Sequence, residues 1–190
     1  GCIARDSVQF IGTDIIFLSS QGVRSLGRTI QEKSMPVNDL SKNVNDELNL
    51  LTTGETPANI KSAYSKTSGF YILTLPTADK TYYFDLRRPL QDNSFRVTRW
   101  DKAFTSAFVN STDTLYLGTA GFVAKHQGYL DGVLSDGTGG STYDLTYESG
   151  WNDLGMSGIN KIPKKIGVVV LGGEGQTMEV MWAVDFVDSF

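Results

Sequence analysis

The sequence has few of the residues on which several classes of protein depend: one cysteine, one histidine and 5 prolines among 190 residues. A single cysteine, Cys2, cannot form an internal disulfide, so the chain is not a disulfide-stabilised secreted module, and Cys2 is expected to act as a small apolar residue. A histidine-based metal site or a Ser–His–Asp triad has only His126 as a candidate member. We expect His126 to be an ordinary surface or turn histidine at the end of a strand.

Long apolar runs and excess positive charge are also missing. No run approaches the roughly 18 apolar residues of a membrane span, and no basic segment followed by an apolar stretch opens the chain, so no membrane span is expected. A net charge of -4 and a pI near 5.0 argue against a basic face that grips nucleic acid. The net charge and the pI do not exclude a protein that forms a wall past which DNA slides. The chain begins with "GCIARD", and we interpret it as a piece of a longer polypeptide.

The composition that is present favours an all-β globular chain. Hydrophobic residues make up 40% and charged residues 20%, which excludes disorder, and 20 glycines indicate many turns.

A short motif occurs twice: "DIIFLSSQGVRSLGR" begins at Asp14 and "DTLYLGTAGFVAKHQ" at Asp113. Aligned without gaps, the two copies agree in residue class at seven positions and share a glycine, Gly22 in one and Gly121 in the other. Each copy is an apolar run, a small polar turn and a second run, which predicts two related β-hairpins in a repeat architecture.

A helix is predicted over residues 38–51, because apolar residues recur there at steps of three and four: Val37, Leu40, Val44, Leu48 and Leu51. Asn38 is the expected N-cap, and Gly54 follows the helix. A second, short helix is expected from Thr56, with Pro57 at its first position.

Strand-type patterns occupy most of the remaining chain. Residues 69–76 and 80–87 are expected to pair as a hairpin across a tight "TADK" turn, with Tyr82, Phe84 and Leu86 on the core face. Further strands are expected in "SFRVTRW" and "FTSAFVNS". Residues 130–144 read as a glycine-rich loop, and residues 164–188 as a last hairpin around "GGEGQ" with a stripe of apolar residues in its second strand: Met178, Val180, Trp182, Val184 and Phe186.

The predicted fold class is therefore mainly β, with partial β-propeller-type blades, a short helical insertion and an additional β-rich segment. Its expected segments are residues 1–37 (hairpin or blade), 38–66 (helical insertion), 67–130 (blade) and 131–190 (glycine-rich loop and C-terminal hairpin).

No set of residues has catalytic or metal-binding spacing, so no catalytic, cofactor or metal residue is assigned and the chain is not expected to be an enzyme. The loops "GGEGQ" and "DGTGG" lack the spacing of a phosphate-binding loop. Asp131, Asp136 and Asp144 do not fit a calcium-binding motif and favour a solvated loop. Glycosidase carboxylates would have to come from Glu148, Asp153 or Asp185, and a sugar-stacking platform from Tyr147, Trp151 and Trp182, although aromatic stripes of this period are more often core.

The order of these pieces, "FLSSQGVRSLGR", "NDLSKNVNDELN", "GFYILTLPTADKTYYFDLRRPLQDNSFRVTRWD", "LYLGTAGFVAKHQG" and "YESGWNDLG", resembles the tail nozzle, or tail tubular B, proteins of short-tailed bacteriophages. The resemblance spans most of the chain and implies a β-propeller with added β-rich and helical parts. It also implies a virion tail protein without cofactors, assembled in the host cytoplasm as a homo-oligomeric ring of six copies. Its expected partners are the tail adaptor and fibre proteins, with viral DNA passing through transiently.

The function expected from this resemblance is structural, as part of the conduit for DNA ejection. A carbohydrate-binding β-module of a tail fibre or lectin-like propeller, using Trp151 and Tyr147, is the alternative. A glycosidase ranks third.

Overall fold

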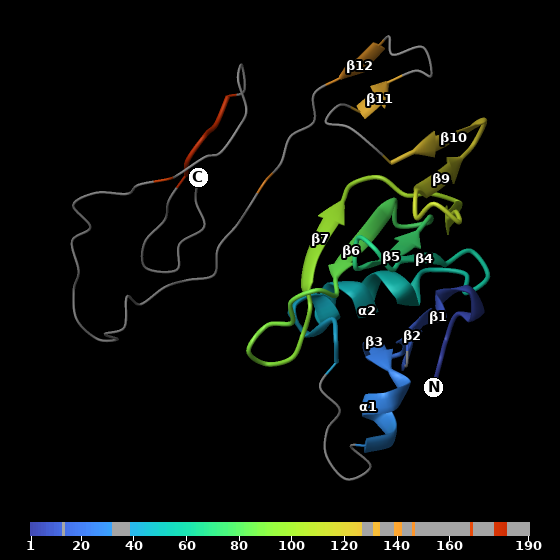
Figure 1. Ribbon diagram of the computed structural model, residues 1–190, viewed down its shortest axis with the longest axis vertical. Coiled ribbons are helices and arrows are strands. Elements are labelled where there is room, and N and C mark those ends of the chain that lie inside the picture. The colour runs from blue at the N-terminus through green and yellow to red at the C-terminus, as the bar shows by residue number, and fades with distance from the viewer. Residues whose placement is uncertain are drawn as a thin grey trace. The chain divides into compact units, whose positions relative to one another are not determined.

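The computed structural model describes residues 1–12, 14–31, 39–126, 131–133, 139–141, 146, 168 and 177–181 (Figure 1). The chain divides into two compact units, Gly1–Thr142 and Tyr143–Phe190, and every helix and strand given below belongs to the first. No helix in the described ranges is both long and apolar enough to cross a membrane.

The fold is mainly β, and each sheet is an antiparallel meander in which neighbouring strands follow one another along the chain. The first sheet consists of β1 (Gln9–Ile11), β2 (Asp14–Ser19) and β3 (Gly22–Ser25). The second consists of β4 (Lys61–Ser65), β5 (Phe70–Leu75), β6 (Lys80–Asp85) and β7 (Arg96–Trp100). The third consists of β8 (Ser106–Val109), β9 (Leu115–Thr119) and β10 (Phe122–Lys125).

Short helices and one small hairpin complete the described elements. The helices are η1 (Arg5–Ser7), α1 (Leu26–Gln31), η2 (Lys42–Val44) and α2 (Asn45–Thr53). The hairpin pairs β11 (Asp131–Val133) with β12 (Gly139–Ser141), so the segment predicted as a glycine-rich loop contains two short strands. A glycine-rich sequence does not prevent pairing, because the backbone alone supplies the ladder hydrogen bonds.

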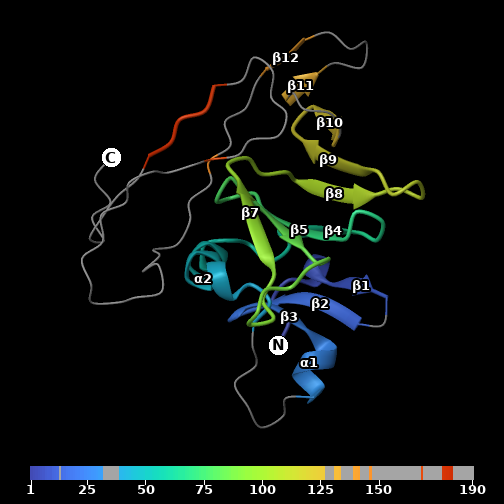
Figure 2. The same ribbon diagram turned by 60° about the vertical axis from the view of Figure 1, so that its left-hand side comes forward.

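The four-stranded sheet is the middle layer of three, with β1–β3 on one side and β8–β10 on the other (Figure 2). Side chains alternate between its faces. Tyr71 and Leu73 face the cluster that contains Ile16 and Leu18 of β2, while Ile72 faces the cluster on the opposite side. Every residue of β5 is consequently buried.

The hairpin predicted across "TADK" is confirmed as β5–β6, with Asp79 of its turn at φ 51°. Tyr82 and Phe84 are fully buried, as predicted for the core face. The opposite face is also covered, because the Tyr83 ring packs at centroid distances of 4.7 Å from Phe70 and 6.0 Å from Trp100. The predicted strands in "SFRVTRW" and "FTSAFVNS" are β7 and β8.

Both copies of the repeated motif form hairpins, β2–β3 and β9–β10, as predicted, but their turns differ by one residue. In the first copy Ser19 pairs with Gly22, and in the second Thr119 pairs with Phe122. The aligned glycines therefore occupy different places: Gly22 begins a strand at φ 120°, whereas Gly121 lies within the turn at φ 94°.

The predicted helix begins later than expected. Residue 38, the expected N-cap, lies outside the described residues, and α2 starts at Asn45 after the turn of η2. Leu40 is not helical because its N–H donates to the carbonyl of Val23 (2.9 Å) and its carbonyl accepts from the N–H of Phe95 (2.8 Å). The predicted burial is confirmed for four of the five apolar residues: Leu40 and Leu48 are buried in the chain's own core, and Val44 and Leu51 pack against it. Val37 lies outside the described residues.

The second predicted helix is wrong. Residues 56–59 form a turn closed by a hydrogen bond from the N–H of Asn59 to the carbonyl of Thr56 (2.8 Å), and β4 follows within the segment predicted to be helical. Pairing with β5 and burial of Ile60 and Ala63 override the local helical signal.

Most of the predicted C-terminal hairpin lies outside the described residues. Residues 177–181 are described and have no regular secondary structure, and Met178 and Val180 are exposed there.

Replacing Leu48 by Ala is expected to lower the free energy of unfolding by about 2–5 kcal/mol, because the side chain is fully buried between β3 and the four-stranded sheet. Leu50→Ala on the same helix is the matched control, since Leu50 is 74% exposed, and should change that free energy by less than about 0.5 kcal/mol. Urea denaturation followed by circular dichroism measures both. Equal effects would contradict the packing of α2 described above.

The two aligned glycines should differ in their tolerance of alanine. Gly121→Ala meets open space and should cost about 1–2 kcal/mol of stability from its positive φ alone. Gly22→Ala should cost about 3 kcal/mol or more, because its Cβ would also collide with the side chains of Asn45 and Ser41. Thermal unfolding of the two variants, each compared with wild type, measures the difference. A smaller cost at Gly22 would contradict the observed turn positions.

Candidate functional site

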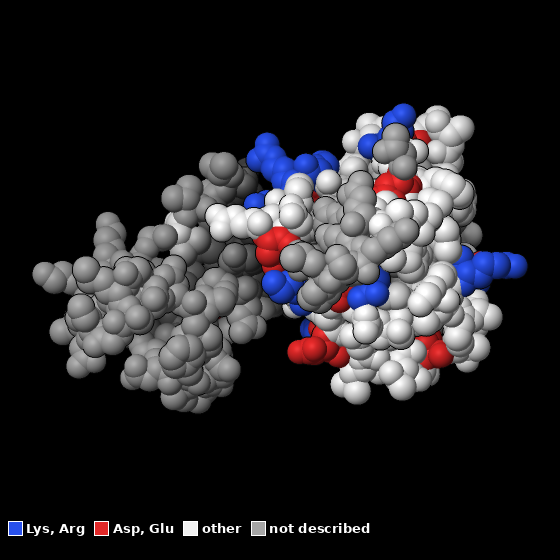
Figure 3. All heavy atoms as spheres, turned by 90° about the horizontal axis from the view of Figure 1, so that it is seen from below, with Lys and Arg blue, Asp and Glu red and all other residues white. Residues whose placement is uncertain are grey.

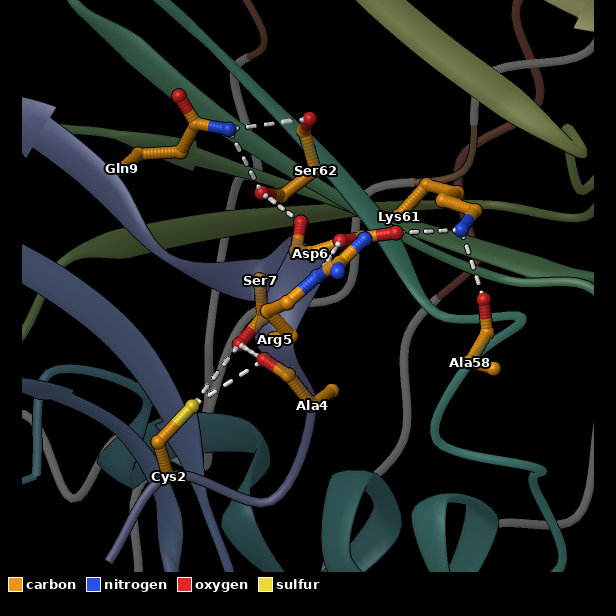
Figure 4. Close-up of polar contacts among 9 residues, drawn as sticks. All are labelled: Cys2, Ala4, Arg5, Asp6, Ser7, Gln9, Ala58, Lys61 and Ser62. Carbon is orange, nitrogen blue, oxygen red and sulfur yellow. Dashed lines mark hydrogen bonds and ion pairs between the residues drawn. The ribbon is translucent and has the colours of Figure 1, made fainter.

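A polar cluster joins η1 to both neighbouring sheets, and Figure 4 shows its residues. The Ser7 hydroxyl donates to the carbonyl of Ala4 (2.7 Å) and accepts from the N–H of Leu18 in β2 (3.0 Å). The carbonyl of Ser7 accepts from the hydroxyl of Tyr71 in β5 (2.8 Å). The buried Ser7 therefore fixes η1 in place from two directions.

Asp6 is the charged centre of this cluster. Its carboxylate accepts from Lys61 Nζ (2.6 Å) and Arg5 Nε (3.0 Å), and Lys61 also donates to the carbonyl of Ala58 (2.7 Å). The hydrogen bond from Lys61, followed by that from Arg5, holds the pKa of Asp6 below its ordinary value. Two cations share one carboxylate, so the cluster carries an excess of positive charge.

Gln9 and Ser62 continue the network along β4, the first strand of the four-stranded sheet. The Ser62 hydroxyl donates to the carbonyl of Asp6 (2.7 Å). Gln9 Nε2 donates to Ser62 Oγ (3.0 Å) and to the carbonyl of Ser62 (3.2 Å). The Gln9 amide thus occupies a backbone acceptor of β4, which is an edge strand of the described sheet.

An open cleft of about 360 Å³ runs beside this network. It is lined by η1 and by the first strand of each sheet, with these residues: Arg5, Asp6, Val8, Gln9, Lys61, Ser62, Ser106 and Ala107. Arg5 and Lys61 can hold an anionic group there by charge-assisted hydrogen bonds. The Ser62 hydroxyl bonds to a backbone carbonyl and an amide, neither of which is a general base, so these contacts do not activate it as a nucleophile.

A second, smaller hollow of about 220 Å³ lies between the second and third sheets, with Asp113 and His126 in its wall. Asp113 Oδ2 accepts from Ser65 Oγ (2.5 Å), from the N–H of Thr67 (3.0 Å) and from that of Ser68 (3.3 Å). These bonds, that from Ser65 first, lower the pKa of Asp113. Its carboxylate therefore serves to fix the β4–β5 turn.

His126 follows β10 directly and is exposed. The backbone N–H of His126 donates to the carbonyl of Leu115 (2.9 Å). The imidazole ring stacks on the Trp100 ring with a centroid distance of 5.5 Å and an interplanar angle of 16°. The residue is exposed as a whole, but neighbouring groups remove part of the hydration of the charged imidazolium, and this desolvation lowers the pKa of His126.

Of the remaining candidate residues, only Cys2 and Asp131 lie in the described part of the chain. Cys2 is exposed, and its Sγ donates to the carbonyl of Ala4 (3.1 Å). Asp131 lies in β11. The other calcium, carboxylate and aromatic candidates lie outside the described residues: Asp136, Asp144, Tyr147, Glu148, Trp151, Asp153, Trp182 and Asp185. In the part of the chain that the structure describes, no group of three or more His, Cys, Asp or Glu side chains could hold a metal ion.

The Asp6 cluster was not predicted from the sequence. Its members come from two segments, around Arg5 and around Lys61, and no local spacing relates the two. The one available signal is the adjacent pair Arg5–Asp6, which is too common in surface turns to indicate a site.

Comparisons of the chain with protein-family models, with curated proteins and with solved structures gave no match.

Replacing Lys61 by Met should raise the pKa of Asp6 toward its ordinary value of 3.8, and Arg5→Met should raise it less, because the Lys61 bond contributes most. In wild type the stabilisation from Asp6 is present above pH 3.8 and is lost as the pH falls through the lowered, folded-state pKa. Carboxyl-carbon NMR titration measures the shifts.

Asp92 is the internal control for this titration. Its pKa is lowered to about 2 by hydrogen bonds from Ser94, away from the cluster, and should not respond to either substitution. A common shift of Asp6 and Asp92 would mean that the variants perturb the whole fold rather than one ion pair.

Proposed function

We propose that the three sheets are successive blades of a β-propeller, and that the chain is a section of a structural subunit of a short-tailed bacteriophage tail nozzle. The observation that carries this proposal is the stacking of consecutive meanders face to face. Such stacking buries every residue of β5 and places an apolar cluster on each side of the four-stranded sheet, as in propellers, where radially arranged sheets cover one another.

The way the sheets converge supports a radial arrangement. β4 packs against β1 on one side and against β8 on the other, so the first strands of the three sheets lie closest together (Figure 2). Toward the last strands, α2 contacts β3 and η2 contacts β7, and Leu48 of α2 belongs to the buried cluster that the first and second sheets share. The sheets are close together at their first strands and are separated by helices at their last strands. Successive sheets are therefore rotated about an axis that lies beside the first strands.

The surface charge fits a wall that DNA passes without adsorbing. Seen from below, the described surface carries scattered basic and acidic side chains between broad uncharged areas (Figure 3). A tube protein with a net charge of -4 neutralises few phosphates, so passing DNA is not retained. The antiparallel ladders give the wall its rigidity.

In this proposal the subunit acts in the virion tail, below the adaptor and beside the fibres, and has no catalytic role. These partners follow from the resemblance to tail nozzle proteins. The stacking of the sheets supports the propeller fold that the resemblance implies. The open cleft beside Lys61 lies along the first strands and would face the axis about which the sheets turn.

The test uses the parent protein with the portal–adaptor complex of the virus that encodes it. Electron microscopy should show rings of the protein at the free end of the adaptor. The Leu48→Asp variant should give no rings, because it buries an unpaired charge, while Leu50→Asp should assemble as wild type does.

Two further assays distinguish this function from its competitors. A glycan array should give no binding, and duplex DNA at physiological salt should form no stable complex. If the protein does not bind the adaptor and binds a glycan saturably, the nozzle proposal is wrong and the protein is a carbohydrate-binding module.

A further inference from the structure

Among the described residues, the outward sides of the first and third sheets carry exposed apolar side chains. The front face is the outward side of β8–β10 and carries Phe108, Tyr116 and Val123. Phe108 is 52% exposed and Val123 64% exposed, and the rings of Phe108 and Tyr116 stack at 5.1 Å with an interplanar angle of 10°. Paired aromatic rings in an exposed cross-strand position are typical of a surface that becomes covered.

The back face is the outward side of β1–β3 and carries Phe10, Ile15 and Phe17. Phe10 pairs with Ile15 across the strands and is 72% exposed, while Ile15 and Phe17 are half-buried. These residues alternate with Ile16 and Leu18, whose side chains point into the core. α1 contacts β2 and β3 and adds the exposed Leu26 and Ile30 beside this sheet.

The repeated hairpin shows how the two faces are related. When the hairpins are matched by their turns, the pair Leu18–Val23 corresponds to Gly118–Val123, and Ile16 corresponds to Tyr116. The front face of the third sheet is thus the equivalent of the face by which the first sheet packs on β4–β7.

The same correspondence applies in the opposite direction. Phe17 matches Leu117 and Ile15 matches Leu115, and these leucines face the four-stranded sheet. The back face of the first sheet is therefore the equivalent of the face by which the third sheet receives β4–β7. Each of the two junctions between the three described sheets joins the front of one sheet to the back of the next.

We propose that the front face of one copy of this chain packs on the back face of a second copy, so that the stacking continues from copy to copy. The inference uses the blade-like stacking of the proposed function, but it does not need the tail or the virus. Both contact surfaces are present in the chain and have the front-to-back relation found at the two internal junctions. Each carries aromatic and aliphatic side chains beside one cation, Lys125 opposite Tyr116 on the front and Arg24, which is paired with Asp39, opposite Phe17 on the back. Such head-to-tail contacts give rings when the rotation closes.

The experiment uses the full chain and four variants. Phe108→Asp and Val123→Asp alter the front face, Phe10→Asp alters the back face, and Leu50→Asp places the same charge on an exposed apolar residue outside both faces. Sedimentation velocity over a range of concentrations gives the state of association, and circular dichroism with urea unfolding checks that each variant folds as wild type does.

Wild type and Leu50→Asp should associate with the same concentration dependence. Each face variant should be monomeric, or associate at concentrations about tenfold or more higher, because a buried unpaired charge opposes the contact. A mixture of Phe10→Asp and Phe108→Asp should form heterodimers and nothing larger, since the first retains an intact front and the second an intact back.

Other results would overturn the proposal. Dimers of Phe10→Asp alone would indicate a front-to-front contact. A wild-type chain that stays monomeric at every concentration, with the front face protected in hydrogen exchange, would mean that a later sheet of the same polypeptide occupies it. In that case the nozzle proposal would survive if rings of the parent protein still bind the adaptor.

Discussion

β5 buries all six of its side chains, three toward each side of the four-stranded sheet, and the rest of the described fold depends on this two-sided burial. An antiparallel sheet in a small domain usually keeps one face in water. Here Tyr71 and Leu73 require a cover on one face and Phe70 and Ile72 require one on the other, because each exposed aromatic or aliphatic side chain would forfeit roughly 1.5–3 kcal/mol of burial. The first and third sheets are those covers, and α2 closes the space that remains beside the first.

Sequence patterns predicted the hairpins β2–β3, β5–β6 and β9–β10, because the alternation of apolar and polar side chains within a strand can be read from the sequence alone. Tyr82 and Phe84 could be assigned to a core face from their spacing alone. Spacing did not predict how the two repeated hairpins are related. The gapless sequence match places Leu18 on Leu117, and both are buried, but the turn of the second hairpin comes one residue later than this match implies. A shift of one residue exchanges the two faces of a strand, so the sequence match and the structural match assign opposite faces.

Other features escaped prediction because they depend on distant partners. The backbone of Leu40 bonds to Val23 and to Phe95, which delays the start of the helix although the apolar period would permit an earlier one. Lys61 reaches Asp6 across two segments of chain, and neither residue stands in a recognisable motif. Local propensity describes single elements, whereas these contacts exist only after the sheets have packed.

The Gln9 amide that bonds to the Ser62 carbonyl has a consequence for how such a chain can associate. An open strand edge can accept a strand from any other chain, and that mode of growth has no defined end. Because Gln9 occupies an acceptor on this edge of β4, a strand arriving there would have to displace the amide before it could pair. Association through the broad sides of the sheets depends instead on side-chain shape, and it can stop at a fixed number of subunits. At this one edge, a side-chain amide thus opposes the addition of a strand.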